Sequence, residues 1–537
     1  MQNWWRGSVT YQIYPRSFQD SNGDGIGDLP GITQRLPHVA SLGVDAIWLS
    51  PFYPSPMLDM GYDVSDYFGV HPDFGTLADF DTLLETAHGL GLKVIVDQVI
   101  SHCAKDHPLF AESRRDRTNP KADWFIWADP QPDGSPPNNW LAIFGGSAWT
   151  WDAGRRQYYM HNFLPEQPTF NFHCPEVQEY FLDVLTFWLD RGVDGFRLDT
   201  VNYYFHDPKL RSNPALPFDR PPVNPYDMQD QIYTKTRPEN VPWLERMRAL
   251  TDRYDARMMV GEVGDALRQI EVMGLYTAGD HRLHMAYSFE MLGDAFSAAF
   301  FRSAVESFFE GAPDGWPCWA FSNHDVPRHA GRWAEHGATD DLARQTAALL
   351  LSLEGSVCLY QGEELGQTDT EMEYHELTDP KGLNFWPDEK GRDGCRTPMV
   401  WDGSAEGGFT TGTPWLPVKP PQAARHVAAL EADADSVLNA YRAILAFRRD
   451  DDALRLGRTR FVDGLPEPVL AFVRQGEGAA TLCVFNLGPR PVTLALTGVG
   501  APIGPGRNAV LDGAELRLGA NGYAWLPAGA DLSVRPA

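Results

Sequence analysis

The sequence predicts an α/β fold: a closed barrel of eight parallel strands alternating with helices, interrupted by one irregular lobe and followed by a separate β domain. Short apolar segments alternate with amphipathic helical patterns over most of the chain. Eight such strand–helix units in series are typical of a (β/α)8 TIM barrel. From about residue 456 the pattern changes to period-two alternation, which is typical of an antiparallel β domain.

The eight predicted strands are short and apolar. They cover residues 9–14, 46–50, 93–98, 195–200, 258–262, 285–289, 318–322 and 356–361. Amphipathic helices are predicted at residues 32–42, 77–90, 176–191, 243–254, 295–310, 340–353 and 436–449. In such a barrel the C-terminal ends of the strands face one common site, so we examined the residues at those ends for function.

Two segments interrupt the strand–helix rhythm. Residues 103–173 are rich in Trp, Pro, Gly and Asn and are too long for a simple loop, so we expect an inserted lobe (domain B) after the third strand. A second, loop-rich insertion covers about residues 366–435. The barrel would then comprise residues 1–102 and 174–455, and a C-terminal β-sandwich domain would comprise residues 456–537.

The composition limits the possible partners and compartments. The 537-residue chain has a formal net charge of −27, which argues against a nucleic-acid or anionic-membrane partner. No apolar run approaches the length of a membrane span, and the first residues lack the apolar segment of a signal peptide. The six cysteines are scattered without metal-type spacing, as in a reducing compartment. We therefore expect a cytoplasmic monomer or homodimer without an organic cofactor.

Acidic residues stand at the C-terminal ends of several predicted strands. These are Asp97, Asp199, Glu262 and Asp325, and Arg197 precedes Asp199 by two residues. Side chains two residues apart on a strand share a face, and a cation that close keeps a carboxylate ionised. A structural ion pair is an equally good interpretation for any one acid. The set on successive strands predicts a site for developing positive charge, as in the oxocarbenium-like transition state of glycoside cleavage.

Four of these segments resemble the conserved regions of the α-amylase family, glycoside hydrolase family 13. They are residues 97–102, 195–200, 260–262 and 321–325, and residues 167–172 resemble a further segment of the family. The resemblance covers nearly the whole chain. It is closest to the bacterial exo-acting α-glucosidase and oligo-1,6-glucosidase group, and it implies a retaining enzyme that forms a covalent β-glucosyl intermediate on an aspartate.

The resemblance implies a role for each acid. Asp199 corresponds to the nucleophile, Glu262 to the general acid/base, and Asp325 to a third carboxylate that holds sugar hydroxyls and favours the distorted ring. Arg197 corresponds to the arginine that orients the nucleophile, and Asp97 to a structural partner. We expect Asp199 to stay ionised, and we expect burial to raise the pKa of Glu262 to roughly 6–7.

The resemblance also implies a closed glucose pocket. Tyr62 corresponds to a residue that stacks on the terminal glucose, and His102 and His324 correspond to histidines that hydrogen-bond the sugar. Asp59 corresponds to an acid that pairs with a late arginine, matched by Arg396. This pair would block the cleft, so that the enzyme removes one glucose from the non-reducing end.

Four more residues complete the predicted substrate site. Phe144 and Phe163 are candidates to line the mouth, although packing within the lobe explains them nearly as well, and Gln167 begins the lobe segment that resembles the family. In the family, Thr at the position of Thr200 is associated with α-1,4 linkages and Val with α-1,6 linkages. We therefore expect small α-glucosides as substrates, chiefly α-1,4-linked disaccharides and short oligosaccharides such as maltose, with sucrose as a further candidate.

A loop after the first strand predicts a structural metal ion. Residues 20–28 place oxygen ligands at alternate positions, with glycine where the chain turns tightly. The glutamate that completes an EF-hand is missing, because Gly31 occupies its position. The resemblance implies that the loop binds Ca²⁺ or Mg²⁺, and a plain acidic turn is the alternative. The ligands would be Asp20, Asn22, Asp24, the carbonyl of Ile26, and Asp28.

Three functions remain open at the level of sequence. The first is an α-glucosidase with some glucosyl transfer, because an alcohol can replace water in the second step. The second is an oligo-1,6-glucosidase, or a sucrose isomerase or related transferase, on the same scaffold. The third is a non-catalytic relative that serves a transporter. The presence of all three acids and the lack of a membrane anchor argue against the third function.

Overall fold

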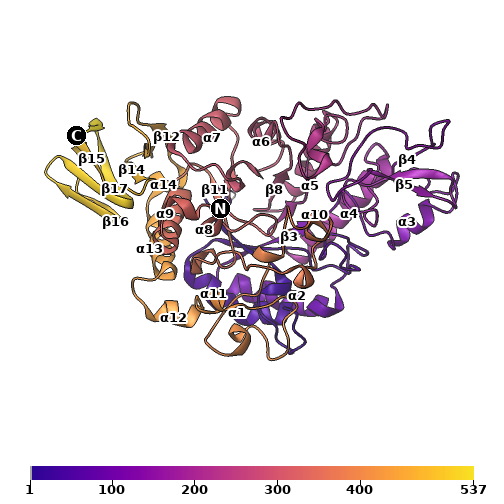
Figure 1. Cartoon of the computed structure of the whole chain (residues 1–537), viewed down its shortest axis with the longest axis horizontal. Helices are drawn as coiled ribbons and strands as arrows, with labels where there is room; N and C mark the ends of the chain where they lie inside the picture. The colour runs from indigo at the N-terminus through magenta and orange to yellow at the C-terminus, as the bar shows by residue number, and fades with distance from the viewer. Residues whose placement is uncertain (1–2) are drawn as a thin grey trace.

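A barrel of eight parallel strands forms the centre of the chain (Figure 1). The computed structural model describes residues 3–537, and the barrel strands are hydrogen-bonded in the order β10-β11-β1-β2-β3-β7-β8-β9. A parallel bridge between Ala286 and Pro317 joins the two ends of this order, which confirms the predicted TIM barrel. The strands are β1 (Val9–Ile13), β2 (Ala46–Leu49), β3 (Lys93–Gln98), β7 (Gly195–Leu198), β8 (Met258–Val263), β9 (Met285–Ser288), β10 (Cys318–Trp319) and β11 (Ser356–Tyr360).

The barrel strands are buried on both faces, as expected for a parallel sheet covered by helices. In β2, Ala46 and Trp48 belong to an apolar cluster that draws residues from most of the strands and fills the barrel interior. Ile47 and Leu49 alternate with them and belong to the larger cluster between the strands and the helices. The β2 strand therefore packs against two apolar cores, one on each face of the sheet.

Helices surround the barrel. Their ends carry recognisable caps: α2 begins with a capping box of Thr76 and Asp79, and α1 ends at Gly43, whose φ is 87°. The helix α6 was not predicted, because its apolar residues do not form a single stripe. The surrounding helices are α1 (Leu29–Leu42), α2 (Leu77–Gly89), α4 (Pro175–Arg191), α5 (Asn240–Thr251), α6 (Gln269–Thr277), α7 (Ala298–Gly311), α8 (His329–Arg332), α9 (Thr339–Leu350), α13 (Val437–Asp450) and α14 (Asp452–Leu456).

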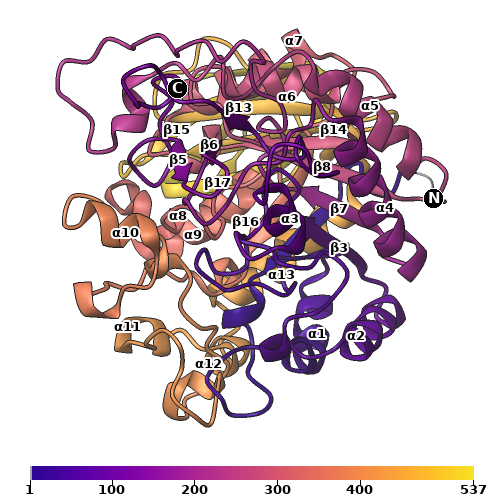
Figure 2. The ribbon, with the colours of Figure 1, turned by 90° about the vertical axis from the view of Figure 1, so that its right-hand side faces the viewer.

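The inserted lobe lies at one end of the molecule, far from the C-terminus (Figure 1), and faces the viewer in Figure 2. It contains α3 (Pro108–Ser113) and a small sheet of β4 (Trp127–Ala128), β6 (Gln157–Met160) and β5 (Trp149–Asp152). An apolar cluster around Trp140 and Trp149 forms its core. The second insertion carries the short helices α10 (Pro380–Phe385), α11 (Pro420–Ala423) and α12 (Val427–Ala432).

The C-terminal region forms a six-stranded β domain with an apolar cluster of its own. The pairs β12–β13, β13–β14 and β14–β17 are antiparallel, which confirms the predicted type of domain. Its arrangement as a sandwich stays a prediction. Trp525 anchors the domain on the barrel by donating to Ser352 Oγ at 2.8 Å. The strands are β12 (Arg458–Phe461), β13 (Val469–Gln475), β14 (Ala480–Asn486), β15 (Val492–Val499), β16 (Ile503–Asp512) and β17 (Glu515–Pro536).

Two further expectations concern the chain as a whole. Within residues 3–537, none of the helices combines the length and the apolar character that crossing a bilayer requires. All six cysteines are free thiols, and five of them are buried.

Candidate active site

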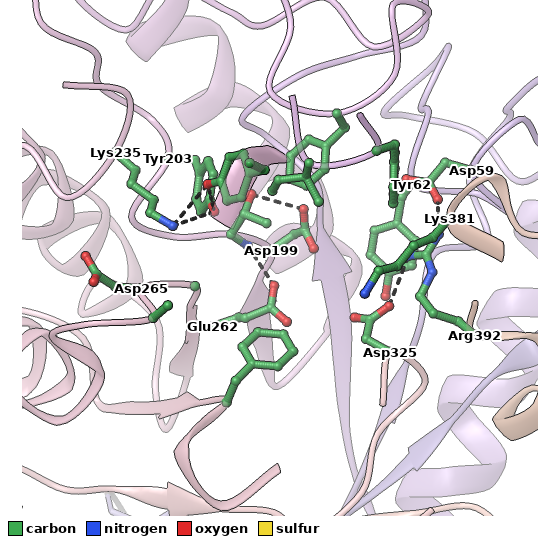
Figure 3. Close-up of a pocket in the computed structure, with 18 of the residues that line it drawn as sticks. Asp59, Tyr62, Asp199, Tyr203, Lys235, Glu262, Asp265, Asp325, Lys381 and Arg392 are labelled. Carbon is green, nitrogen blue, oxygen red and sulfur yellow. Dashed lines mark hydrogen bonds and ion pairs between the residues drawn. The ribbon is translucent and has the colours of Figure 1, made fainter. Parts of the chain in front are cut away.

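A cavity of about 360 Å³ lies at the C-terminal ends of the barrel strands (Figure 3). Asp199 follows β7, Glu262 is in β8 and Asp325 follows β10, so three separate strands bring the acids together. Arg197, Gln167 and Arg396 are fully buried behind the cavity wall. The predicted residues that line the cavity are Asp59, Tyr62, His102, Phe144, Phe163, Asp199, Thr200, Glu262, His324 and Asp325.

Arg197 is the centre of the charge network beneath the cavity. Its Nη1 donates to Asp199 Oδ1 at 2.7 Å and to Asp97 Oδ1 at 2.8 Å, and its Nη2 lies 2.8 Å from Glu262 Oε1. The hydroxyl of Tyr287, on β9, accepts from Arg197 Nη2 at 2.9 Å and donates to Glu262 Oε1 at 3.1 Å. A single cation is therefore shared by three carboxyl groups.

Burial, which Arg197 only partly offsets, sets the proton affinity of the two central acids. Burial raises the pKa of Asp199 and of Glu262 to about 7 each, and Arg197 opposes the shift in both. The shift in Glu262 has the expected direction. The shift in Asp199 differs from the expectation, because Asp97 and Asp325 repel its charge and Arg197 is divided between partners. Ionisation of one carboxyl group then disfavours ionisation of the other. When the pair holds a single proton, it therefore consists of one carboxylic acid and one carboxylate.

Thr200 links the two central carboxyl groups directly. Its N–H donates to Glu262 Oε2 at 3.1 Å, and its hydroxyl donates to Asp199 Oδ2 at 3.2 Å. The same hydroxyl lies 3.0 Å from Ser101 Oγ, which follows β3. The φ of Thr200 is 42°, a left-handed value that is uncommon for a β-branched residue and persists only where the surrounding structure enforces it. The turn after β7 thus orients both carboxyl groups.

The expected ion pair between Asp59 and Arg396 is wrong, because a different arginine holds Asp59. Arg392 Nη2 lies 2.7 Å from Asp59 Oδ1, and its Nη1 lies 3.1 Å from Asp325 Oδ1. Arg396 instead donates to Asp325 Oδ1 at 2.9 Å and to the carbonyl of His324 at 2.7 Å. Burial would raise the pKa of Asp325, but His324 and the two arginines outweigh it and hold that pKa well below its ordinary range. Asp325 is therefore a permanent carboxylate.

Two histidines and a tyrosine form the cavity wall next to Asp325. Gln12 donates to His324 Nδ1 at 2.8 Å, so the proton of the neutral ring is on Nε2, which lies 3.3 Å from Asp325 Oδ2. His102 Nε2 donates to the carbonyl of Tyr62 at 2.8 Å, and burial lowers the pKa of His102 to about 4. The rings of Tyr62 and His324 stack with centroids 5.1 Å apart. Both histidines are neutral hydrogen-bonding groups at physiological pH.

Sequence reasoning missed the residues on the other side of the central acids. Tyr203, Tyr226 and Lys235 come from the long connection between β7 and α5, and Asp265 follows β8. The ammonium of Lys235 donates to the hydroxyls of Tyr203 and Tyr226 at 3.0 and 3.1 Å. This connection has neither helical nor strand periodicity, and its unusual length was the available signal. Arg392 was also missed, although it lies four residues before Arg396.

The predicted metal loop is closed by its own hydrogen bonds. Asp20 Oδ1 accepts from the N–H of Asn22 at 2.9 Å, and its Oδ2 accepts from the N–H of Gly25 at 2.8 Å and from the Thr410 hydroxyl. Asp28 Oδ2 accepts from Ser21 at 2.8 Å. Residues 3–537 contain no group of three or more His, Cys, Asp or Glu side chains arranged to hold a metal ion. An ion in this loop therefore stays a prediction.

Known proteins resemble this chain over almost its whole length. Residues 12–457 match the family described as "Alpha amylase, catalytic domain", and residues 466–536 match the C-terminal immunoglobulin-like domain of D-apionate lactonase. A protein named "Probable alpha-glucosidase" from Rhizobium meliloti is 55% identical over 504 residues, which cover 92% of this chain and 91% of that protein. An oligo-1,6-glucosidase from Heyndrickxia coagulans is 35% identical over 529 residues, covering 92% and 94% of the two chains.

Solved structures agree with these relatives. The α-glucosyl transfer enzyme XgtA is 52% identical, with a TM-score of 0.94, over 98% of this chain and 99% of that chain. The trehalulose synthase MutB from Pseudomonas mesoacidophila MX-45 is 32% identical, with a TM-score of 0.88, over 99% of both chains. The match to the catalytic domain agrees with the structure, in which three acids at the ends of the barrel strands surround one cavity. This chain belongs to the α-amylase family, glycoside hydrolase family 13, and is a glycoside hydrolase.

Proposed function

We propose that this glycoside hydrolase is a retaining, exo-acting α-glucosidase that releases glucose from the non-reducing end of α-1,4-linked disaccharides and short oligosaccharides. The observation that carries the proposal is that a single guanidinium, that of Arg197, contacts both Asp199 and Glu262 beside one cavity. The relatives named alpha-glucosidase, from Rhizobium meliloti and Pediococcus pentosaceus among others, support the substrate class.

The proposed reaction has two steps. In the first, Asp199 attacks the anomeric carbon, the bond to the leaving group breaks, and Glu262 gives its proton to the departing oxygen. The product is a β-glucosyl ester of Asp199. In the second step Glu262 takes a proton from water, which attacks the same carbon and releases glucose with retained configuration. A retaining enzyme requires the two carboxyl groups to lie about 5–5.5 Å apart, a spacing consistent with their sharing one guanidinium.

The proposed exo-action rests on the charged end of the cavity. Asp59, Arg392 and Asp325 form a continuous network there, and Tyr62 and His324 form the adjacent wall. Carboxylates and a guanidinium bind the hydroxyls of one sugar ring from several directions, because each hydroxyl both donates and accepts. A network that closes this end leaves room for one terminal glucose and excludes a continuing chain.

The linkage and the acceptor are the finer parts of the proposal. Thr200 favours α-1,4 linkages by resemblance, whereas three relatives named oligo-1,6-glucosidase favour α-1,6 as the alternative. A second alternative, sucrose isomerisation, is favoured by the similarity to MutB, one mutant of which was solved with "the substrate sucrose". The similarity to a protein described as an α-glucosyl transfer enzyme supports additional glucosyl transfer to alcohols.

Product analysis separates these possibilities. The enzyme is incubated with maltose, isomaltose or sucrose, and the first sugar released is followed by proton NMR. The proposal expects α-glucose before mutarotation, faster cleavage of maltose than of isomaltose, and glucose plus fructose from sucrose. Initial β-glucose would overturn retention, and isomaltulose or trehalulose as the main product from sucrose would establish the isomerase. Cleavage of a maltooligosaccharide whose non-reducing end is blocked would overturn exo-action.

A further inference from the structure

The cavity has a second side that the glucose pocket does not use. In Figure 3, Asp199 and Glu262 lie between two groups of residues: Asp59 and Asp325 are on one side, and Lys235 with Tyr203 is on the other. All of these residues line the same cavity. If the first side holds the glucosyl ring, the scissile bond crosses the central acids, and the leaving group must contact the side that contains Lys235.

The residues on this side have hydrogen-bond donors to spare. The Lys235 ammonium donates to the hydroxyls of Tyr203 and Tyr226, and those hydroxyls lie 3.0 Å from each other. An ammonium has three donors and each phenol has one. The three internal bonds use two ammonium donors and one phenolic donor. One N–H of Lys235 and one phenolic O–H remain for a ligand. Both are donors, so the ligand needs an oxygen that accepts hydrogen bonds.

Lys235 is also a buried charge, and the nearby acids Asp265 and Asp227 interact with it only from beyond ion-pair distance. It is 5% exposed, and it forms no ion pair with an Asp or Glu within residues 3–537. A buried charge is costly unless it is paired, so a partner from the ligand would be favourable. The neighbouring Asp265 is taken by other groups: it accepts from the Thr236 hydroxyl at 2.8 Å and lies 3.4 Å from Arg268 Nε. Asp227 also lines the cavity; burial raises its pKa, and the charge of Lys381 opposes this shift more than that of Lys235 does.

The walls around this side are aromatic. The ring centroids of Tyr203 and Phe163 are 5.8 Å apart, and Phe163 continues this wall towards the glucose side, where its centroid lies 4.9 Å from that of His102. Ile143 adds an aliphatic surface to the same lining. A leaving group that combines a flat apolar body with an acceptor oxygen therefore has contacts for both parts.

We propose that Lys235, together with Tyr203 and Tyr226, binds the leaving group and makes the enzyme favour α-glucosides whose leaving group carries a carboxylate. The carboxylate accepts hydrogen bonds from the free N–H of Lys235 and from the free phenolic O–H, and it supplies a counter-charge in direct contact with the ammonium. Lys235 is a specificity-determining residue in this arrangement, because it touches neither the anomeric carbon nor the departing oxygen. The inference rests on the proposed α-glucosidase function and specifies its leaving-group side.

The test compares two matched substrates, the α-glucosides of 4-hydroxybenzoate and 4-hydroxybenzamide. The two substrates have almost the same shape but differ in charge. The ratio of their kcat/KM values therefore cancels most of the binding and chemical contributions that are common to both. Because the two phenols differ as leaving groups, the quantity to compare is this ratio in the wild type and in Lys235→Gln. We expect the carboxylate-to-amide ratio to fall by about tenfold in Lys235→Gln, the factor expected for the loss of one charged hydrogen bond.

Two controls make the outcome decisive. Lys209→Gln removes an exposed lysine of the same connection and should leave the ratio unchanged. Hydrolysis of α-glucosyl fluoride, whose leaving group is too small to reach Lys235, reports folding and the chemistry at Asp199. Equal ratios in the wild type and Lys235→Gln, with fluoride hydrolysis intact, would overturn the inference alone. A wild-type enzyme that does not hydrolyse the fluoride would instead overturn the proposed function.

Discussion

Arg392 forms a partly buried ion pair with Asp59, with 2.7 Å between Nη2 and Oδ1. The same guanidinium lies 3.1 Å from Asp325 Oδ1 and 2.6 Å from Asp379 Oδ1. Asp59, Asp325 and Asp379 thus share the Arg392 guanidinium, and Asp325 has Arg396 as a second cation. Removing the Arg392 guanidinium would leave negative charge unpaired where the glucosyl ring is proposed to bind.

Replacement of Arg392 should therefore disable the pocket. Charged hydrogen bonds contribute roughly 1.5–3 kcal/mol each, so the loss of the Arg392 guanidinium from the pocket should lower kcat/KM for maltose in Arg392→Leu by about 100-fold or more. The matched control is Arg425→Leu, which removes a partly exposed arginine 2.6 Å from Asp340. Steady-state kinetics on both variants check the prediction, and a loss of less than tenfold in Arg392→Leu would contradict it.

The two central acids should respond differently to the quality of the leaving group. Asp199→Asn should lose nearly all activity on every substrate, because no nucleophile remains. Glu262→Gln should lose nearly all activity on maltose but keep substantial glucosyl transfer from α-glucosyl fluoride, since fluoride leaves without a proton. Circular dichroism confirms that both variants fold. Equal losses on the two substrates in Glu262→Gln would remove its assignment as the acid.

Glu262 should also make the protein less stable as the pH rises. Burial raises the pKa of Glu262 from 4.5 to about 7. Between these values the folded state binds more protons than the unfolded state, so the free energy of unfolding falls with rising pH over that window and then levels off. We expect Glu262→Gln to raise the Tm more at pH 8 than at pH 5.

Calorimetry at the two pH values measures this difference. Glu310→Gln, which changes an exposed carboxyl in α7, serves as the control and should shift the Tm equally at both pH values. A Tm difference between Glu262→Gln and the wild type that does not depend on pH would contradict the raised pKa. The same pKa places the alkaline limb of the kcat/KM profile near pH 7, because the first step requires a protonated Glu262.

Local patterns in the sequence predicted the barrel and the central acids, because both depend on short-range periodicity. Asp199 and Glu262 end apolar strands, and parallel strands of a barrel present their C-terminal ends to one site. The partner of Asp59 could not be predicted in this way. Arg392 and Arg396 lie in one irregular segment, and only its fold decides which guanidinium faces the cavity.

Lys235 was missed for a related reason. It lies in a connection of about forty residues without periodicity, and its contacts with Tyr203 and Tyr226 join positions 32 and 9 residues apart. No short motif encodes such a cluster. The proton affinity of Asp199 was also beyond the sequence, because it depends on the burial of the carboxyl group and on its distances to Arg197, Asp97 and Asp325.

Thr200 gives a test of linkage preference. Thr200→Val keeps the shape of the side chain but removes the hydroxyl that lies 3.2 Å from Asp199 Oδ2 and 3.0 Å from Ser101 Oγ. We expect the ratio of kcat/KM for maltose to that for isomaltose to fall by about tenfold, since both the hydrogen bonds and the wall beside the scissile bond change. Thr200→Ser, which keeps the hydroxyl, is the control and should keep most of the preference. An unchanged ratio in Thr200→Val would show that other residues set the linkage.

Chelation tests the loop at residues 20–28, which we propose holds a structural Ca²⁺ or Mg²⁺ ion. An ion that binds only the folded state stabilises it, so dialysis against EDTA should lower the Tm, and either ion should restore it. Asp20 already accepts hydrogen bonds from Asn22, Gly25 and Thr410, so the loop has a way to hold itself closed without an ion. If the loop is closed by these hydrogen bonds alone, the Tm should be the same before and after dialysis, and elemental analysis should find no bound ion. Because the loop contributes no group to the cavity, kcat at a temperature well below the Tm should not change in either case.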